Sequence, residues 1–297
     1  MSAREVYPQV YITSTMTPNL GAMRSYLLDI GAHDWDFADS TGDLIDPGEY
    51  RSPNDVEKII EFAGRLCYKS FGVGLNPNIT KVRNNPKDYI GNIIKSGHGS
   101  VLEHVHIGFT LHNVSRVFTH ELVRHRHGNF SQESMRYVRY TEIPFMPPRS
   151  FSTLLPPSLM QPDTPMQAKL DFWADQLRKN GNRMALMGQW QEELAADWEI
   201  DDIKDFHTKK LLTSDFRRTI PQGVATEIMW TTNLRELRHV IEQRTSLGAE
   251  TEIREVFAII AAACKARFPK AFADFNMIRN PKDPFDLPEW SAANKKV

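Results

Sequence analysis

The sequence has 297 residues, of which 41% are hydrophobic and 25% charged, which is typical of a globular protein and argues against disordered, collagen-like and membrane-spanning classes. Its 36 Lys and Arg residues are balanced by 37 Asp and Glu residues, which disfavours binding to nucleic acid or membranes through overall positive charge. Two cysteines are too few for a disulfide scaffold or a four-thiolate zinc site, and no apolar signal segment is present. These features predict a cytoplasmic protein.

The first third of the chain contains two predicted helices. Residues 1–50 lack clear periodicity, so we interpret them as an N-terminal elaboration. Ser52-Pro-Asn-Asp55 is typical of a helix start, and apolar residues at helical spacing follow it as far as Cys67. A second helix is predicted from Asn85 to Gly97. Both Cys67 and Cys264 are predicted to be small core residues rather than reactive thiolates.

The next segment changes to a period of two. Residues 105–112 alternate between apolar and polar side chains, which predicts a half-buried strand. Ser115 is a suitable cap for a short helix over about 116–123. The polar segment from Asn129 to Glu133 is predicted to be a loop, and residues 136–140 are predicted to be extended.

The C-terminal half is predicted to be mainly helical. A helical pattern covers residues 165–198, with a predicted break at Asn180-Gly181, and two further helices are predicted over 233–245 and 249–267. We interpret about 150–210 as an insertion. Helices before and after a short set of strands predict an α+β fold, in which one domain contains a small, mostly antiparallel sheet flanked by helices.

Histidine and arginine gather in one part of the sequence. Seven of the ten histidines lie between residues 98 and 127, and five arginines lie between 116 and 139. This concentration favours a pocket for anions, proton transfer or a metal ion. His104 and His106 would share one face of a strand, as in some metal sites. Nearby cations oppose a divalent ion, however, and no Asp or Cys cluster completes a ligand set, so we predict no metal site.

The run Arg124-His-Arg-His127 also fits a nucleic-acid contact, because aromatic residues that could stack on bases lie nearby. The run is short, however, and two or three arginines suffice to bind a small phosphorylated ligand through paired guanidinium contacts. We therefore favour a small-molecule pocket. A non-catalytic basic-pocket nucleic-acid-binding protein is the alternative, and a metal-dependent nucleotide hydrolase is a third hypothesis.

Residues 124–137 resemble the signature of the flavin-dependent thymidylate synthases, in which Arg-His-Arg is followed, after seven residues, by Ser-x-Arg-Tyr. The positions in register are Arg124, His125, Arg126, Ser134, Arg136 and Tyr137. Further segments that are similar to the family are Gly97 to His104, Arg217 with Pro221, Asn233-Leu-Arg235, Arg244 and Glu252-Ile253.

This resemblance implies an enzyme that converts dUMP to dTMP. It implies methylenetetrahydrofolate as the one-carbon donor and FAD, reduced by NADPH, as the hydride carrier. It also implies a homotetramer in which several subunits build each FAD site. The lack of a convincing nucleophilic thiol agrees with this chemistry, because the flavin supplies the redox step.

The resemblance assigns roles to matching positions. The predicted FAD-binding residues are His98, Ser100, Arg124, His125, Arg126, Asn233, Arg235 and His239. The predicted dUMP-binding residues are Arg124, Gln132, Glu133, Ser134, Met135, Arg136, Arg217 and Arg244. Arg244 is the predicted catalytic group, because the family's arginine at this position lies against the pyrimidine ring and stabilises its negative charge. On a helix, Asn233 and Arg244 would share one face about 16 Å apart.

Four positions depart from the family pattern. Glu121 stands where some members have Gln, which places a carboxylate near the nucleotide. Asn129 replaces a common Ser and Gln132 a common Glu, and both keep hydrogen-bonding capacity. Gly248 stands where many members have a His near the flavin.

Overall fold

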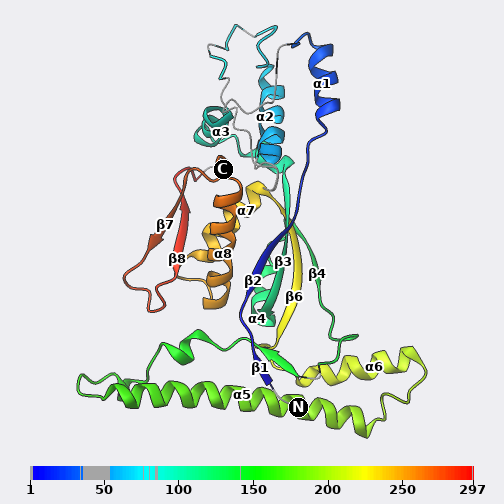
Figure 1. Cartoon of the computed structure of the whole chain (residues 1–297), viewed down its shortest axis with the longest axis vertical. Coiled ribbons are helices and arrows are strands. Elements are labelled where there is room, and N and C mark those ends of the chain that lie inside the picture. The colour runs from blue at the N-terminus through cyan, green and yellow to red at the C-terminus, as the bar shows by residue number, and fades with distance from the viewer. Residues whose placement is uncertain are drawn as a thin grey trace, which may run out of the picture.

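A four-stranded antiparallel sheet lies at the centre of the computed structural model, which describes residues 3–33, 35, 54–75, 77–79, 81–83, 86–140, 142–295 and 297. In spatial order its strands are β2 (Gln9–Thr15), β3 (His106–Ser115), β6 (Ala225–Asn233) and β4 (Gly128–Gln132) (Figure 1). The predicted strand over 105–112 is confirmed as β3, with Ile107, Phe109 and Leu111 fully buried. The N-terminal elaboration predicted over 1–50 contains β2, which pairs with β3, and its residues 36–50 lie outside the described part.

The loop predicted over 129–133 is wrong, because most of this segment forms the edge strand β4. Gly128 pairs with Thr232 and Gln132 with Ile228. An edge strand with one solvated face tolerates polar side chains, so polarity alone did not distinguish it from a loop. The extended segment predicted over 136–140 is also wrong at its start, since residues 135–137 form a turn.

Three helices cover one face of the sheet. They are α4 (Arg116–Leu122), α7 (Leu234–Thr245) and α8 (Thr251–Arg267). All three match predicted helices, and the Ser115 hydroxyl accepts from the Phe118 amide as the predicted cap of α4. The buried Trp230 ring of β6 stacks on Phe109, and its centroid lies 5.7 Å from that of Phe257 in α8. These contacts fix α8 against the sheet.

A second helical layer lies beyond one end of the sheet (Figure 1). It contains α1 (Leu20–Asp29), α2 (Asn54–Tyr68), α3 (Pro86–Lys95) and the 3-10 helix η1 (Gly99–His104). The two helices predicted here are confirmed, although Ser52, Pro53 and Asn85 lie outside the described residues. After α3, Gly97 adopts a φ of +74°, a left-handed conformation that favours glycine and lets the chain turn into η1.

The prediction that Cys67 is a core residue is wrong, because its side chain is exposed, whereas Cys264 is buried as predicted. The buried face of α2 is rotated away from its apolar stripe and includes Glu61 and Arg65. The Arg65 Nε donates to Glu61 Oε1 at 2.8 Å, and the guanidinium lies 3.9 Å from the ring centroid of Trp35. This paired and stacked charge is buried in place of Cys67.

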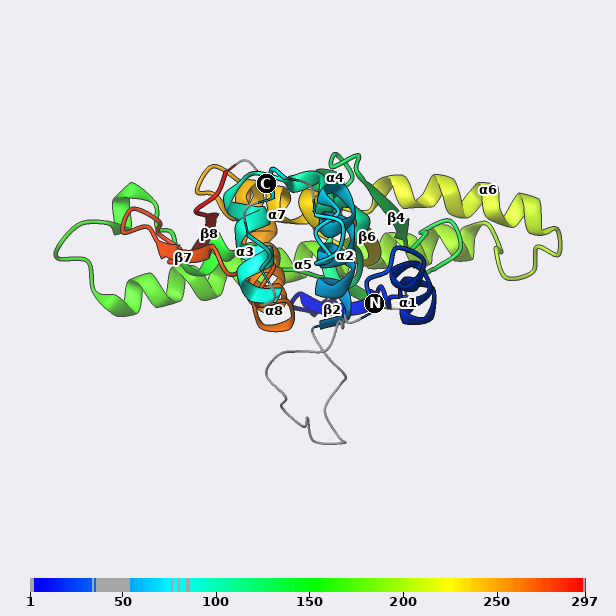
Figure 2. The same ribbon diagram turned by 90° about the horizontal axis from the view of Figure 1, so that it is seen from above.

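The base of the molecule is the 32-residue helix α5 (Met166–Asp197), which crosses below the sheet and extends past it on both sides (Figures 1 and 2). The break predicted at Asn180-Gly181 is wrong. A Cβ at Gly181 would lie 3.7 Å from the Phe145 ring, an ordinary contact distance, so the helix continues through the glycine and packs beside β5. A glycine inside a helix costs only about 1 kcal/mol, which such packing offsets.

Short elements complete the base and the opposite flank. At the base lie β1 (Ala3–Glu5), β5 (Ile143–Phe145), α6 (Phe206–Phe216) and the 3-10 helices η2 (Arg149–Ser152), η3 (Pro157–Leu159) and η4 (Arg217–Thr219). The hairpin of β7 (Phe275–Arg279) and β8 (Pro288–Ala292) packs against α7 and α8. Within the described residues, no helix is both long and apolar enough to cross a membrane.

Candidate functional site

The Arg-His-Arg run lies between the end of α4 and the start of β4. Arg124 and Arg126 are exposed, and neither has an ion-pair partner among the described residues, whereas His125 is 9% exposed. The run therefore presents two uncompensated guanidinium groups to solvent on either side of one buried imidazole. Such groups are available to an anionic ligand.

Arg244, in the last turn of α7, joins this run through the buried imidazole. Its Nε donates to His125 Nε2 at 2.7 Å. Its two terminal nitrogens donate to Glu121, one to the carboxylate at 2.7 Å and the other to the backbone carbonyl at 3.1 Å. The predicted catalytic residue and one predicted FAD-binding residue are thus in direct contact.

His125 is held in its neutral form. Burial lowers its pKa from 6.5 to about 4, and electrostatic interactions with Arg244 and His239 act in the same direction. Because Nε2 accepts a hydrogen bond from Arg244, the proton of the neutral ring is on Nδ1. Glu236 Oε1 lies 3.8 Å from that Nδ1.

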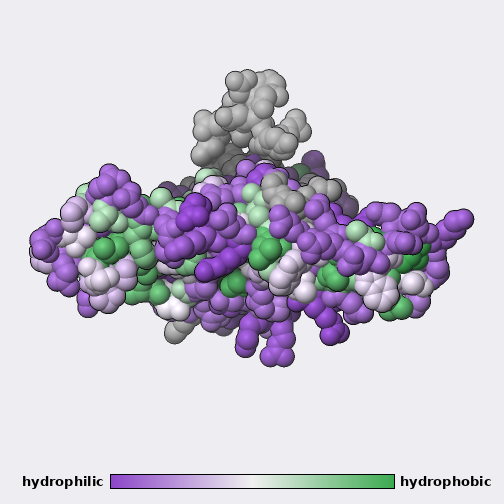
Figure 3. Space-filling view, turned by 90° about the horizontal axis from the view of Figure 1, so that it is seen from below, coloured by the Kyte–Doolittle hydropathy of each residue, from purple (hydrophilic) through white to green (hydrophobic). Residues whose placement is uncertain are grey.

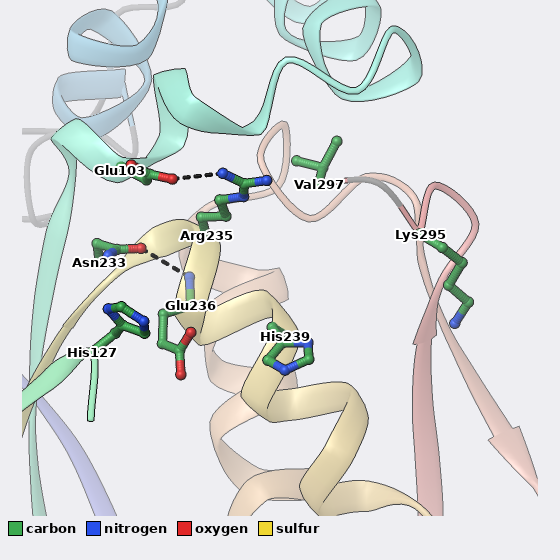
Figure 4. A pocket seen from close by; sticks show the side chains of 8 residues that line it. All are labelled: Glu103, His127, Asn233, Arg235, Glu236, His239, Lys295 and Val297. Carbon is green, nitrogen blue, oxygen red and sulfur yellow. Dashed lines mark hydrogen bonds and ion pairs between the residues drawn. The ribbon is translucent and has the colours of Figure 1, made fainter. Parts of the chain in front are cut away.

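A pocket of about 360 Å³ opens at the first turn of α7 (Figure 4). Its lining residues are Glu103, His127, Asn233, Arg235, Glu236, His239, Lys295 and Val297. Three of the predicted FAD-binding residues, Asn233, Arg235 and His239, are among them. We refer to this cavity as the α7 pocket.

The local structure around the α7 pocket explains how its residues are oriented. Asn233 is the N-cap of α7, and its side-chain oxygen accepts from the Glu236 amide at 2.9 Å. The Arg235 side chain crosses the pocket to Glu103, with a nitrogen–oxygen distance of 2.6 Å (Figure 4). A Cβ at Gly99 would lie only 2.7 Å from Arg235 Nε, so glycine leaves the space that this arginine occupies.

Two further predicted FAD-binding residues lie on η1 or at its start. His98 is the N-cap of η1, and its ring lies 3.2 Å from the Tyr68 hydroxyl. His98 and Ser100 are both exposed. Neither lines the α7 pocket in a single chain, although η1 contributes Glu103 to it.

Most of the predicted dUMP-binding residues follow the other end of β4. The Gln132 side chain donates to Thr119 Oγ1 at 3.1 Å, and Glu133 accepts from the Tyr140 hydroxyl at 3.0 Å. The Ser134 hydroxyl accepts from the Arg136 amide at 3.4 Å, which forms a small polar turn. The Nε of Arg136 is buried without a partner among the described residues, so it is available to an anion.

Met135 and Arg217 line a second pocket, of about 430 Å³, between the β4–β5 connection, α5 and α6. The neighbouring Arg218 is outside this pocket, and its side chain is 83% exposed. The Arg217 Nε donates to the Ser214 carbonyl at 3.2 Å. The predicted insertion contributes α5 to the pocket wall.

The structure thus separates the predicted site into two groups. Arg124 and His125 come just before the first residue of β4, Gly128, and Arg244 contacts His125. Ser134 and Arg136 instead follow the last residue of β4, Gln132. The four residue steps of β4 correspond to about 13 Å at a rise of roughly 3.3 Å per residue. Neither of these two pockets is lined by both Arg235 and Arg217.

Several residues at the site were not predicted. His127 and Glu236 line the α7 pocket, and both lie beside predicted residues in the sequence. Arg116, at the start of α4, has a buried terminal nitrogen without a partner among the described residues.

Gly248, where many family members have His, has no atom within 4 Å of the position a Cβ would take. Within the described part of the chain, no group of three His, Cys, Asp or Glu residues has the arrangement of a metal site.

The fold and the site define an α+β protein with exposed guanidinium groups and a helix N-terminus, which are features that suit an anionic ligand. Residues 50–270 match the family model described as "Thymidylate synthase complementing protein". Two relatives, the flavin-dependent thymidylate synthases of Mycobacterium bovis and Mycobacterium tuberculosis, are each 33% identical to this chain over 243 residues. Each match covers 79% of this chain and 89% of the relative. The chain belongs to the flavin-dependent thymidylate synthase family of enzymes.

A solved structure was also found to be similar. It is thymidylate synthase X from Helicobacter pylori, crystallised with FAD and dUMP, with a TM-score of 0.47 and 20% identity. The match covers 73% of this chain and 93% of that one.

Proposed function

We propose that this protein converts dUMP to dTMP, with methylenetetrahydrofolate as the one-carbon donor and NADPH as the reductant of a bound FAD. The observation that supports this most strongly is the contact between Arg244 and His125, which joins helix α7 to the Arg-His-Arg run. Family membership supports the reaction. The alternative of a non-catalytic nucleic-acid-binding protein has no comparable support.

The Arg-His-Arg run and the N-terminus of α7 have the groups that suit a flavin dinucleotide. Arg124 and Arg126 are exposed and without ion-pair partners among the described residues, so they can neutralise a pyrophosphate or an anionic flavin ring. The helix N-terminus at Asn233 adds a favourable dipole for negative charge. When bound, FAD would supply the hydride. The role of the chain's own residues is to bind and orient the reactants.

In this proposal Ser134, Arg136 and Arg217 bind the nucleotide, and Arg244 lies against its pyrimidine ring. A guanidinium held beside the ring stabilises negative charge that develops on it, which raises the nucleophilicity of the carbon that accepts the one-carbon unit. Gln132, Glu133 and Met135 form the adjoining part of the nucleotide site. The unpartnered Nε of Arg136 supports an anion at this turn.

We further propose that the active form is a homotetramer. In one chain, Ser134 and Arg136 follow the end of β4 opposite to Arg124 and Arg244, although all four are predicted to bind the nucleotide, so a second copy can supply the missing half of each site. The outer face of the sheet also exposes large apolar side chains, with Tyr11 50% and Met229 40% exposed. On the underside, separate hydrophobic patches lie among hydrophilic residues along the base (Figure 3).

The direct test is the formation of dTMP by the purified protein supplied with dUMP, FAD, NADPH and methylenetetrahydrofolate. We expect turnover by the wild type, and a loss of about 100-fold or more in kcat for Arg244→Ala with unchanged thermal stability, because one charged contact to the transition state is removed. Wild-type protein that binds no flavin and forms no dTMP would contradict the proposal. Full activity in Arg244→Ala would remove that residue from the mechanism.

A further inference from the structure

The Arg244 guanidinium is held on three sides by residues from outside its own helix. His125 Nε2 accepts from Nε at 2.7 Å, and Glu121 accepts from both terminal nitrogens through its carboxylate, at 2.7 Å, and its backbone carbonyl, at 3.1 Å. Three acceptors around a planar group fix its position and the orientation of its plane. Few rotamers of Arg244 can satisfy all three.

These contacts leave part of the guanidinium available. An arginine side chain has five N–H groups, of which Nε carries one and each terminal nitrogen carries two. His125 and Glu121 accept three of them, so one N–H on each terminal nitrogen has no partner among the described residues. The Arg244 side chain is still 19% exposed, and these two N–H groups can face a ligand.

The ion pair between Arg244 and Glu121 differs from the ion pairs that stabilise the fold. The Arg238 side chain is 1% exposed and donates from both terminal nitrogens to the two carboxylate oxygens of Asp274, at 2.9 and 3.0 Å. Arg238 and Asp274 tie α7 to the segment before β7. Glu121 instead is 30% exposed and lies just before the Arg-His-Arg run, where an ion pair adds little to stability.

We propose that Glu121 is a positioning residue, which holds the Arg244 guanidinium so that its two remaining N–H groups point at the substrate ring. The carboxylate also balances the charge of Arg244 when no substrate is bound. This inference rests on the proposed function, in which Arg244 contacts the nucleotide. In this role Glu121 acts through its contacts with Arg244.

The first test is structural and does not depend on activity. Crystal structures of the wild type, Glu121→Gln and Glu121→Ala are compared at the Arg244 side chain. We expect Glu121→Gln to keep the wild-type position, because the amide oxygen still accepts from Arg244. Glu121→Ala keeps the backbone carbonyl and the His125 contact but loses the charged acceptor, and we expect the guanidinium to leave its wild-type position in this variant. An Arg244 side chain that stays in place in Glu121→Ala would overturn the inference.

The second test is kinetic. In Glu121→Ala we expect kcat to fall by about 10- to 100-fold, the usual effect of a misplaced catalytic group, and in Glu121→Gln by less than about 5-fold. In an Arg244→Ala background, adding Glu121→Ala should change kcat by less than about 2-fold, because the two residues act as one unit. Equal losses from Glu121→Ala with and without Arg244 would contradict the positioning role.

The matched control is Asp175→Asn. Asp175 pairs with Arg178 on α5 at 2.5 Å, and its side chain is 33% exposed, close to the 30% of Glu121. It should change neither kcat nor the position of Arg244. If the wild type forms no dTMP, the proposed function fails, while the crystal structures still decide whether Glu121 positions Arg244.

Discussion

A neutral His125 makes stability depend on pH in a defined direction. Its pKa is about 4 in the folded protein, against 6.5 for an ordinary histidine, so the unfolded chain binds more protons between these values. The contribution of His125 to stability is therefore full above pH 6.5 and is lost as the pH falls toward 4. The arginine beside it, Arg244, adds to this effect.

We expect His125→Gln to remove this dependence. Relative to the variant, the wild type should lose roughly 3 kcal/mol of unfolding free energy between pH 6.5 and pH 4, measured by urea unfolding at several pH values. A difference between the two proteins that does not change with pH would show that His125 is not held neutral.

Glu252 should make the unfolding free energy change with pH in the opposite direction. Burial raises its pKa from 4.5 to about 7, against the opposing hydrogen bonds from the Ser115 amide and hydroxyl. Because the folded protein holds the proton more tightly, the stabilisation is present below pH 4.5 and is lost as the pH rises through 7. Relative to Glu252→Gln, the wild type should lose roughly 3 kcal/mol over this range in the same urea experiment. If the wild type instead gains unfolding free energy relative to Glu252→Gln between pH 4.5 and pH 7, the pKa of Glu252 is not raised.

At the residue scale, sequence motifs named the candidate site residues but could not give their contacts. The resemblance assigned Arg244 and His125 to the site, and the structure shows them in contact. It also marked Glu121 as unusual. That Glu121 accepts from Arg244 depends on how α4 and α7 pack, which no pattern within either helix specifies.

At the scale of elements, Asn233 combines capping with a place in the α7 pocket. Asn233→Ala removes the acceptor for the Glu236 amide and should lower the unfolding free energy by about 1 kcal/mol. Asn233→Asp keeps the cap and should preserve stability, but it adds a negative charge beside an anionic ligand. We therefore expect both variants to bind FAD more weakly in a fluorescence titration. Wild-type affinity in Asn233→Asp would place the flavin phosphates elsewhere.

The helices were predicted better than the strands for physical reasons. The amphipathic periodicity of α7 and α8 follows directly from their buried residues. Strand β6 was missed because its buried positions include Thr226 and Thr232, whose hydroxyls hide the alternation. Helix α2 was predicted with the wrong buried face, because its face contains the neutralised pair of Glu61 and Arg65.

At the scale of the whole molecule, the predicted binding residues lie at both ends of β4. This separation supports the proposal that each site is shared between chains. We expect light scattering of the purified protein to give four times the mass of a single chain. Disrupting the outer sheet face with Met229→Asp should lower the mass and the activity together, because a charge there opposes burial against another copy. A fully active monomer would contradict the tetramer.

The central claim is that Arg244 and the Arg-His-Arg run meet the Ser134–Arg136 turn around one flavin and one nucleotide. A crystal structure of the protein with FAD and dUMP tests it most directly. We expect Arg244 to donate to the pyrimidine ring from its two remaining N–H groups, while Arg136 of one chain or another contacts the phosphate. A complex in which Arg244 has no contact with the nucleotide would contradict the claim.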